Sequence, residues 1–235
     1  MNGKTKRIPR WIREEFFGWS PWEIAWFFIA TAVIVSLSLF WHDSVIAIFS
    51  SLTGVWCVIL TGKGKLSSFF VGLINSVLYA YIAFGAKYYG DVMLNLFYYV
   101  PTGVIGICCW TKNMNRETGE VLKKKLTGKQ SIALYLFSAL AVGIYGGILS
   151  LLGGSLPLVD STSTVLSIVA QILCIKRYAE QWVIWIAVNT VTVVMWIFAF
   201  FRGTESVATL LMWVIYLLNA IFMWVKWRRE AKNAL

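Results

Sequence analysis

Residues 182–201 read WVIWIAVNTVTVVMWIFAFF, twenty residues without a charged side chain. A helix of about 20 apolar residues matches the roughly 30 Å thickness of the hydrocarbon core of a bilayer, so this run predicts a membrane-spanning helix. Apolar runs of similar length recur along the chain. The sequence predicts eight spans, at residues 22–41, 44–61, 66–86, 90–111, 131–152, 160–175, 182–201 and 205–225.

Composition and charge agree with a membrane protein. Hydrophobic residues make up 59% of the 235 residues and charged residues 14%, which is typical of proteins embedded in a bilayer. The net charge of +10 would also suit nucleic-acid binding, so the placement of the basic residues must decide. With a cytoplasmic N-terminus, all of the 21 Lys and Arg except Lys87 and Arg202 fall in cytoplasmic segments. The positive-inside rule therefore predicts that both termini are cytoplasmic, and no nucleic-acid partner is expected.

The chain contains an internal duplication. When it is shifted against itself by 114 residues, three spans align without a gap on three others. The aligned segments are 44–61 with 158–175, 66–86 with 180–200, and 90–111 with 204–225. The most informative matches are Asn75 with Asn189, Lys63 with Arg177, and Trp110 with Trp224. Because residues 131–152 cross the membrane once between the triplets, the two repeats are parallel, an arrangement known from transporters.

The expected fold is an all-α polytopic membrane protein with eight transmembrane helices. Two parallel three-helix bundles are joined by a linker helix, in a 3+1+3 order, and an extra N-terminal helix lies outside the duplication. The expected boundaries are an amphipathic cytoplasmic segment 1–21, an accessory helix 22–41, a first repeat 44–111, a basic cytoplasmic connector 112–130, a linker helix 131–152, a second repeat 158–227 and a cytoplasmic tail 228–235.

A polar side chain inside a spanning helix must find a partner in the bundle or face water, so such residues mark the interior. On the seventh span Trp182, Trp185 and Asn189 are spaced i, i+3 and i+7 and share one helical face. Asn75 is the repeat mate of Asn189. Two less specific explanations stay open: tryptophans near helix ends commonly anchor a span at the interface, and asparagines commonly bridge helices.

Two other spans add candidates. Asn95 and Tyr98 share a face of the fourth span, next to Pro101, which lacks an N–H and is expected to disturb that helix. Gln171 ends a polar stripe on the sixth span. The predicted substrate-binding residues are Asn75, Asn95, Tyr98, Gln171, Trp182, Trp185 and Asn189.

Charged residues are absent from the middle of every predicted span. Coupling to protons or sodium usually needs a buried carboxylate or an ion cage, so an uncoupled facilitator is expected. The spans also lack a catalytic residue set and a metal cluster, so we expect no enzyme activity, metal or cofactor. A membrane-embedded enzyme or a structural protein remains a distant alternative.

The candidate residues suit a particular kind of substrate. Indole faces and amides without an opposing charge favour a neutral or singly cationic ring-bearing polar molecule. A sugar remains an alternative substrate, and the paired tryptophans are the feature that distinguishes the two, because a sugar site would need only one stacking ring.

Three stretches resemble the PnuC family, which transports the vitamin B3 form nicotinamide riboside. RYAEQWVIWIAVN (177–189) resembles the second-repeat signature of the family. GLINSVLYAY (72–81) and LNLFYYVPTGVIGICCW (94–110) are similar to the matching first-repeat segments. The resemblance covers about residues 44–227.

The resemblance implies a SWEET-like fold, a homotrimer in the bacterial inner membrane, and facilitated diffusion with uptake drawn inward by phosphorylation of the riboside in the cytoplasm. It implies that Trp182 and Trp185 flank the nicotinamide ring, while Gln171, Asn189 and Asn75 bind its carboxamide or ribose. Related branches carry thiamine or riboflavin on the same scaffold, so another ring vitamin is the first alternative.

Overall fold

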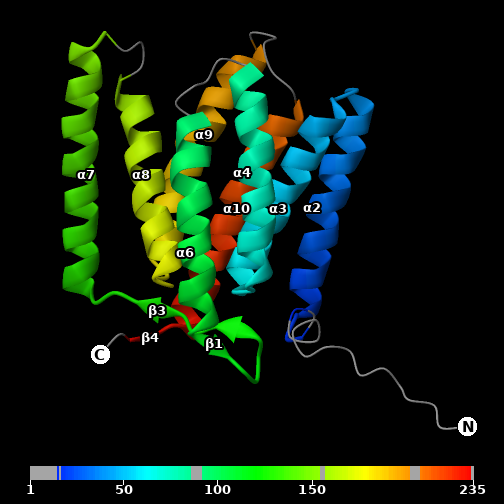
Figure 1. The fold of residues 1–235 in the computed structure, drawn as a ribbon, viewed down its shortest axis with the longest axis vertical. Helices are drawn as coiled ribbons and strands as arrows, with labels where there is room; N and C mark the ends of the chain where they lie inside the picture. Colours follow the sequence, from blue (N-terminus) through cyan, green and yellow to red (C-terminus); the bar gives the residue numbers. More distant parts are fainter. Residues whose placement is uncertain (1–14, 16, 86–91, 154–156, 202–206, 234–235) are drawn as a thin grey trace, which may run out of the picture.

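The computed structural model describes residues 15, 17–85, 92–153, 157–201 and 207–233 (Figure 1). The described chain is largely helical, in agreement with the expected class. Its helices are α2 (Pro21–Phe40), α3 (Val45–Lys63), α4 (Ser67–Gly85), the π-helix η1 (Leu94–Tyr99) continued by α6 (Val100–Thr111), α7 (Gly128–Leu151), α8 (Pro157–Ile175), α9 (Gln181–Phe201) and α10 (Val207–Glu230).

Seven helices in the described ranges are long and apolar enough to cross a membrane. In α9 the apolar stretch found among the described residues, Gln181–Val194, is shorter than these seven. The predicted count of eight spans therefore stays a prediction. The amphipathic segment predicted for residues 1–21 lies mostly outside the described residues.

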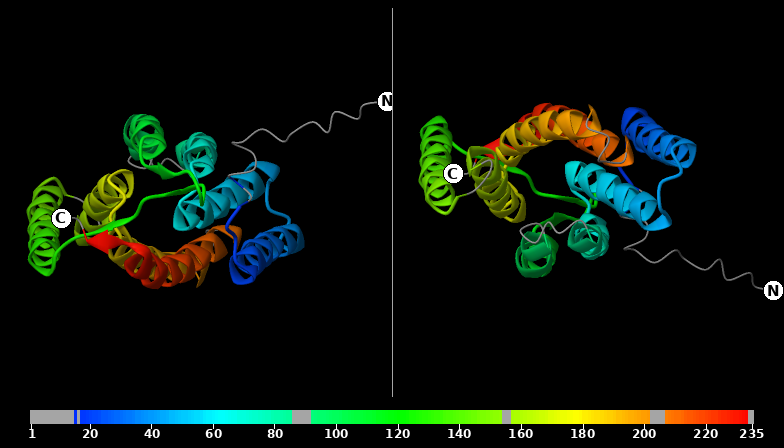
Figure 2. Two further views of the ribbon diagram at one scale, coloured as in Figure 1. Left: turned by 90° about the horizontal axis from the view of Figure 1, so that it is seen from below. Right: turned by 90° about the horizontal axis from the view of Figure 1, so that it is seen from above.

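Six helices close into a ring when the bundle is viewed along its long axis (Figure 2). Around this ring α3 packs on α4 and α10, α9 packs on α10 and α8, and α6 packs on α4 and α8. α7 lies outside the ring against α8, and α2 lies outside it against α3 and α10. The two predicted repeats therefore meet at two seams, α3 with α10 and α6 with α8.

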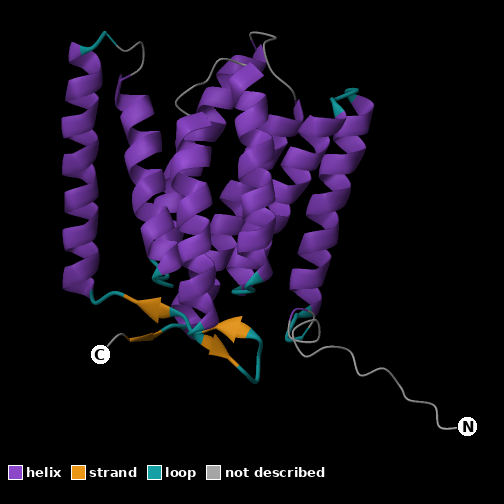
Figure 3. Ribbon diagram, viewed as in Figure 1, coloured by secondary structure: helices purple, strands orange, loops and turns teal. Residues whose placement is uncertain are grey.

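Four short strands gather at one end of the bundle (Figure 3). β1 (Met114–Asn115) pairs antiparallel with β2 (Glu120–Val121), and β3 (Lys124–Lys125) pairs parallel with β4 (Lys232–Asn233). The expected all-α fold did not include these strands. We call this end the strand end; the distribution of basic residues predicts that it faces the cytoplasm.

Pro101 explains the irregular start of the fourth predicted span. Without an N–H it cannot donate to the carbonyl one turn earlier, and its ring crowds that turn. The helix widens there into η1, where the Val100 N–H bonds to the Asn95 carbonyl five residues back. The disturbance expected from Pro101 is thus present as a π-helical segment.

Two buried indoles join the repeats at the strand end. Trp110 Nε1 on α6 donates to the Cys174 carbonyl on α8 at 3.0 Å, and Trp227 Nε1 on α10 donates to the Gly62 carbonyl on α3 at 2.6 Å. Each third helix therefore bonds to the end of the first helix of the other repeat. The sequence match of Trp110 with Trp224 is wrong for this role, because Trp224 is only half-buried and lies under Arg228.

Three Lys and three Glu form a closed ring of alternating charge at the strand end. In order around this ion-pair ring they are Glu23, Lys63, Glu120, Lys123, Glu230 and Lys226. Lys63 Nζ lies 2.8 Å from Glu23 Oε2 and 2.8 Å from Glu120 Oε1. The ring ties α2, α3, β2 and α10 together. It also explains why α10 continues past its predicted end at residue 225 into the expected tail.

Backbone bonds hold the connector against both repeats. The Val121 N–H donates to the Gly64 carbonyl after α3, and the Lys124 N–H donates to the Arg177 carbonyl after α8. Lys65 is fully buried, and its ammonium donates to the carbonyls of Phe17 and Gly119. Lys63 and Lys65 thus have a structural role that the count of cytoplasmic charges did not predict.

Glu120 gives the ion-pair ring a pH dependence. Burial alone would raise the pKa of Glu120, but Lys123 and Lys63 outweigh it, and the pKa lies below its usual value of 4.5. A carboxylate with a lowered pKa stabilises the folded state above its unfolded pKa, and the stabilisation is lost as the pH falls toward the folded pKa. Acidification through the usual carboxyl range should therefore weaken the ring.

We expect Glu120→Gln to lower the free energy of unfolding near neutral pH by about 1.5–3 kcal/mol, because two charge-assisted hydrogen bonds are weakened. The variant should also lose less stability than the wild type on acidification. Glu117→Gln, an exposed change on the same turn, is the control. Thermal unfolding across a pH series checks this; equal pH profiles for wild type and Glu120→Gln would contradict it.

Candidate functional site

α9 carries a set of buried polar atoms that lack hydrogen bonds. Gln181, Trp182 and Asn189 are 0%, 2% and 3% exposed. Within the described part of the chain, both amide atoms of Gln181, Nε1 of Trp182 and Oδ1 of Asn189 have no hydrogen-bond partner. Buried polar atoms in native proteins are nearly always paired. The concentration of four such atoms on one helix therefore indicates a place for water or a ligand.

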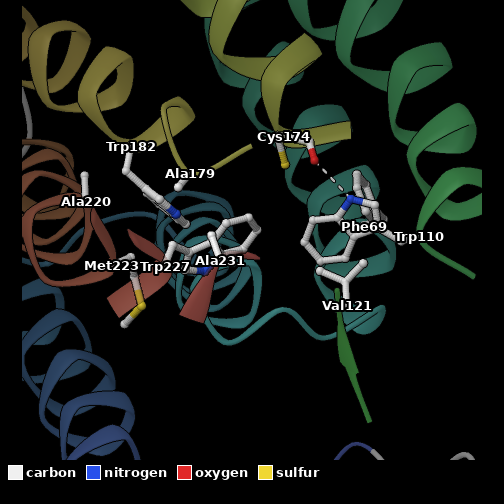
Figure 4. Close-up of a cluster of buried hydrophobic side chains, with 10 residues drawn as sticks. All are labelled: Phe69, Trp110, Val121, Cys174, Ala179, Trp182, Ala220, Met223, Trp227 and Ala231. Carbon is white, nitrogen blue, oxygen red and sulfur yellow. Dashed lines mark hydrogen bonds between the residues drawn. The ribbon is translucent and has the colours of Figure 1, made fainter. Parts of the chain in front are cut away.

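Trp182 is a core side chain. It packs edge-on against Trp227, with ring centroids 5.8 Å apart and planes at 75°, and Figure 4 shows the two indoles close to Met223 and Ala220. An interfacial anchor would be exposed to the headgroup region, whereas Trp182 is almost fully enclosed. The anchor explanation for Trp182 is therefore wrong.

Trp185 is half-buried and joins two clusters of apolar side chains. It packs against the cluster that contains Trp182 and also against a cluster of Ala170, Leu173 and Ile184 between α8 and α9. Asn189 lies one turn further along the same face. Indole faces, an indole N–H and an amide carbonyl are thus presented together by two turns of one helix.

Asn75 bridges α4 and α3. Its Nδ2 donates to the Ser50 carbonyl at 2.7 Å and to Thr53 Oγ1 at 3.3 Å. The helix-bridging explanation for Asn75 is therefore confirmed as at least part of its role. Ser50 Oγ beside it is buried and has no hydrogen-bond partner within the described residues. The ring of six helices therefore holds an unpaired polar atom near Asn75 as well.

Tyr216 is a neighbour of Asn75 that the polar pattern alone did not identify. A Cβ on Gly54 would lie 2.0 Å from the Tyr216 hydroxyl and 3.1 Å from Asn75 Nδ2. The absent side chain of Gly54 thus lets the Tyr216 hydroxyl of α10 pass over α3 toward α4. A glycine inside a span was the available signal, because small residues permit close approach between membrane helices.

The remaining candidates lie on η1 and α8. Asn95 is buried within η1, and Gln171 is half-buried on α8. Tyr98 donates its hydroxyl to the Ile168 carbonyl of α8 at 2.9 Å, so it links the two repeats. The seven predicted residues come from α4, η1, α8 and α9, and their convergence on one chamber stays a prediction.

Two surface hollows lie elsewhere. A groove of about 550 Å³ runs between α7 and α8, lined by apolar side chains such as Phe137 and Ile144. A smaller pocket of about 220 Å³ lies at the strand end beside Arg177. None of the seven predicted residues lines either of them. Among the described residues, no group of three or more His, Cys, Asp or Glu could hold a metal ion.

Comparison with known proteins identifies relatives over most of the chain. Residues 44–229 match the family described as nicotinamide mononucleotide transporter. The nicotinamide riboside transporter PnuC of Neisseria mucosa is 39% identical, with 98% of this chain and 90% of that protein covered. The protein of the same name from Haemophilus influenzae is 34% identical, with 94% and 96% covered.

A solved structure has the same fold. The crystal structure of the vitamin B3 transporter PnuC superposes with a TM-score of 0.83 and 38% identity, and the match covers 94% of this chain and 97% of that one. Fold and sequence therefore agree on one family.

We expect Gly54→Ala to destabilise the protein by about 1–3 kcal/mol, because the added methyl group overlaps the Tyr216 hydroxyl. Adding Tyr216→Phe should restore part of the loss, since the clashing oxygen is then gone. Gly143→Ala on α7, where an added Cβ meets nothing within 4 Å, is the control. Thermal unfolding of the wild type, both single variants, the double variant and the control checks the coupling; additive effects of the two changes would contradict the contact.

Proposed function

The chain belongs to the PnuC family of membrane transporters, and from that premise we propose that it carries nicotinamide riboside across the membrane by facilitated diffusion. Enzyme activity and a cofactor are not part of the proposal. A homotrimer in the bacterial inner membrane, with both termini in the cytoplasm, is part of it and rests on the family resemblance and the placement of basic residues.

The observation that carries the proposal is the set of unpaired polar atoms on α9. Asn189 Oδ1 can accept a hydrogen bond from a carboxamide N–H, and Trp182 Nε1 can donate one to a carbonyl or hydroxyl oxygen. Nicotinamide riboside offers a carboxamide and hydroxyl groups. Its cationic ring would gain about 0.5–2 kcal/mol over the face of an indole such as Trp185.

The charge of the spans favours the riboside over the mononucleotide. A phosphate group requires Arg or Lys donors, and no charged side chain lies in the middle of a predicted span. The buried lysines Lys63 and Lys65 already bond to protein oxygens at the strand end. We therefore propose a site for an uncharged ribose with its attached ring.

We propose alternating access as the mechanism. The repeats would rock about the seams between α3 and α10 and between α6 and α8, with η1 as the irregular segment that absorbs the change. The absence of a charged group in the middle of the spans leaves nothing to couple movement to an ion gradient. Phosphorylation of the riboside in the cytoplasm would then draw net uptake.

The experiment is exchange of labelled nicotinamide riboside in proteoliposomes without an ion gradient. We expect exchange by the wild type and its loss in Asn189→Ala and Trp185→Ala. Thr190→Ala is the matched control, because Thr190 is exposed next to Asn189 and its hydroxyl bonds to the Ile186 carbonyl of its own helix. Unaltered exchange in Asn189→Ala would contradict the site.

Two additions separate the alternatives. Unlabelled thiamine, riboflavin, glucose and nicotinamide mononucleotide should each compete more weakly than unlabelled riboside. A proton or sodium gradient should leave the final level of riboside unchanged, and gradient-driven accumulation would show that the uncoupled mechanism is wrong.

A further inference from the structure

A second polar pocket lies at the strand end, apart from the α9 site. It has a volume of about 220 Å³ and is formed by the end of α6, by β3 and by the turn that follows α8. Its polar lining consists of Cys109, Asn113, Lys124, Lys176, Arg177 and Tyr178. The proposed transport path uses none of these residues.

Three cations line this pocket without counter-ions. Within the described residues, no carboxylate forms an ion pair with Lys124, Lys176 or Arg177. Arg177 is only 8% exposed, and its Nη1 donates to the Leu122 carbonyl at 3.1 Å. Burial lowers the pKa of Arg177, since a cation removed from water without an anion nearby is disfavoured. The pocket therefore holds positive charge that a bound anion would neutralise.

The equivalent position in the first repeat is neutralised by the protein itself. Lys63, the repeat mate of Arg177, lies 2.8 Å from an oxygen of Glu23 and 2.8 Å from an oxygen of Glu120. Neither carboxylate belongs to the duplicated spans, since one is on α2 and the other on β2. The duplication has thus left a cationic position after each first helix, and the described protein supplies carboxylates to only one of them.

The end of α8 does not account for the three cations. The negative end of a helix dipole attracts positive side chains, but the last carbonyls of α8 are already used. The Cys174 carbonyl accepts from Trp110 Nε1 and from the Arg177 N–H, and the Leu173 carbonyl accepts from the Tyr178 N–H. These hydrogen bonds neutralise most of the negative partial charge at the end of α8, so little of it remains for Lys124, Lys176 and the Arg177 guanidinium.

We propose that this pocket binds a phosphate group. An arginine fork and two lysines are the donors that phosphate oxygens prefer. The group could be carried by an anionic phospholipid or by a soluble phosphate ester, since basic pockets between helices on the cytoplasmic side of a membrane bind phospholipid headgroups. Because the pocket joins α6, β3 and α8, a bound phosphate ties the two repeats at one seam.

The test is thermal unfolding of the full-length protein with each source of phosphate added separately. Inorganic phosphate is compared with chloride at equal ionic strength, and phosphatidylglycerol is compared with phosphatidylcholine in mixed micelles. Stabilisation by inorganic phosphate, with or without an effect of phosphatidylglycerol, shows that the pocket accepts a soluble phosphate, and stabilisation by phosphatidylglycerol alone identifies the lipid as the source. If neither raises the unfolding temperature above its comparison, the proposal is wrong.

Variants locate the effect. The double variant Lys124→Gln and Lys176→Gln should bind the effective probe at least about tenfold more weakly, whereas Lys124→Arg with Lys176→Arg should keep binding. Lys112→Gln with Lys129→Gln removes the same charge from exposed positions outside the pocket and is the control. Equal weakening by both Gln pairs would overturn the proposal, because the effect would then reflect net charge. A cooperative unfolding transition in each variant without added phosphate shows that it is folded.

Discussion

A polar atom buried among membrane helices cannot turn to bulk water, so it must be paired inside the protein or by something the protein binds. Several buried polar side chains of the helix bundle are paired inside the protein. Trp110 and Trp227 donate to carbonyls across the seams, and Asn219 of α10 accepts from Trp26 and donates to the Val58 carbonyl. Gln181, Trp182 and Asn189 on α9 hold atoms that are not paired. Ser50, Ser68 and Trp213 on other helices also hold one unpaired atom each, but among the described residues only α9 carries four. That contrast is the physical basis for placing the site there.

The strand end holds the two halves together more firmly than simple helix packing would. Indoles, an alternating ring of charge and backbone bonds from the connector all lie at this end. A buried ion pair adds little net stability compared with an apolar pair, but it specifies one arrangement and is costly to break. Under the proposed alternating access, opening at this end would require these contacts to separate, and their strength would then contribute to the balance between the two states.

The sequence predicted the helical class and most of the long apolar helices, because the length of an apolar run and the thickness of a bilayer define a span independently of its partners; the count of eight spans stays a prediction. It was less informative where a role depends on contacts between helices. The Tyr216 hydroxyl and the Asn75 amide both lie against Gly54, where a larger side chain would not fit. Lys63 meets Glu23 across 40 residues of chain. The sequence register paired Trp110 with Trp224, whereas the equivalent bond is made by Trp227, one turn later. A side chain three residues further along a helix points in nearly the same direction, so a shift of register by one turn leaves no mark in the sequence.

The central claim is that the unpaired atoms on α9 are completed by substrate. A structure determined with saturating nicotinamide riboside tests it most directly. The account predicts ligand density inside the ring, with the carboxamide within hydrogen-bond distance of Asn189 and the pyridinium ring against Trp182 or Trp185. Density for the riboside in the groove between α7 and α8, or a protein partner for Asn189 Oδ1 in the bound state, would contradict it.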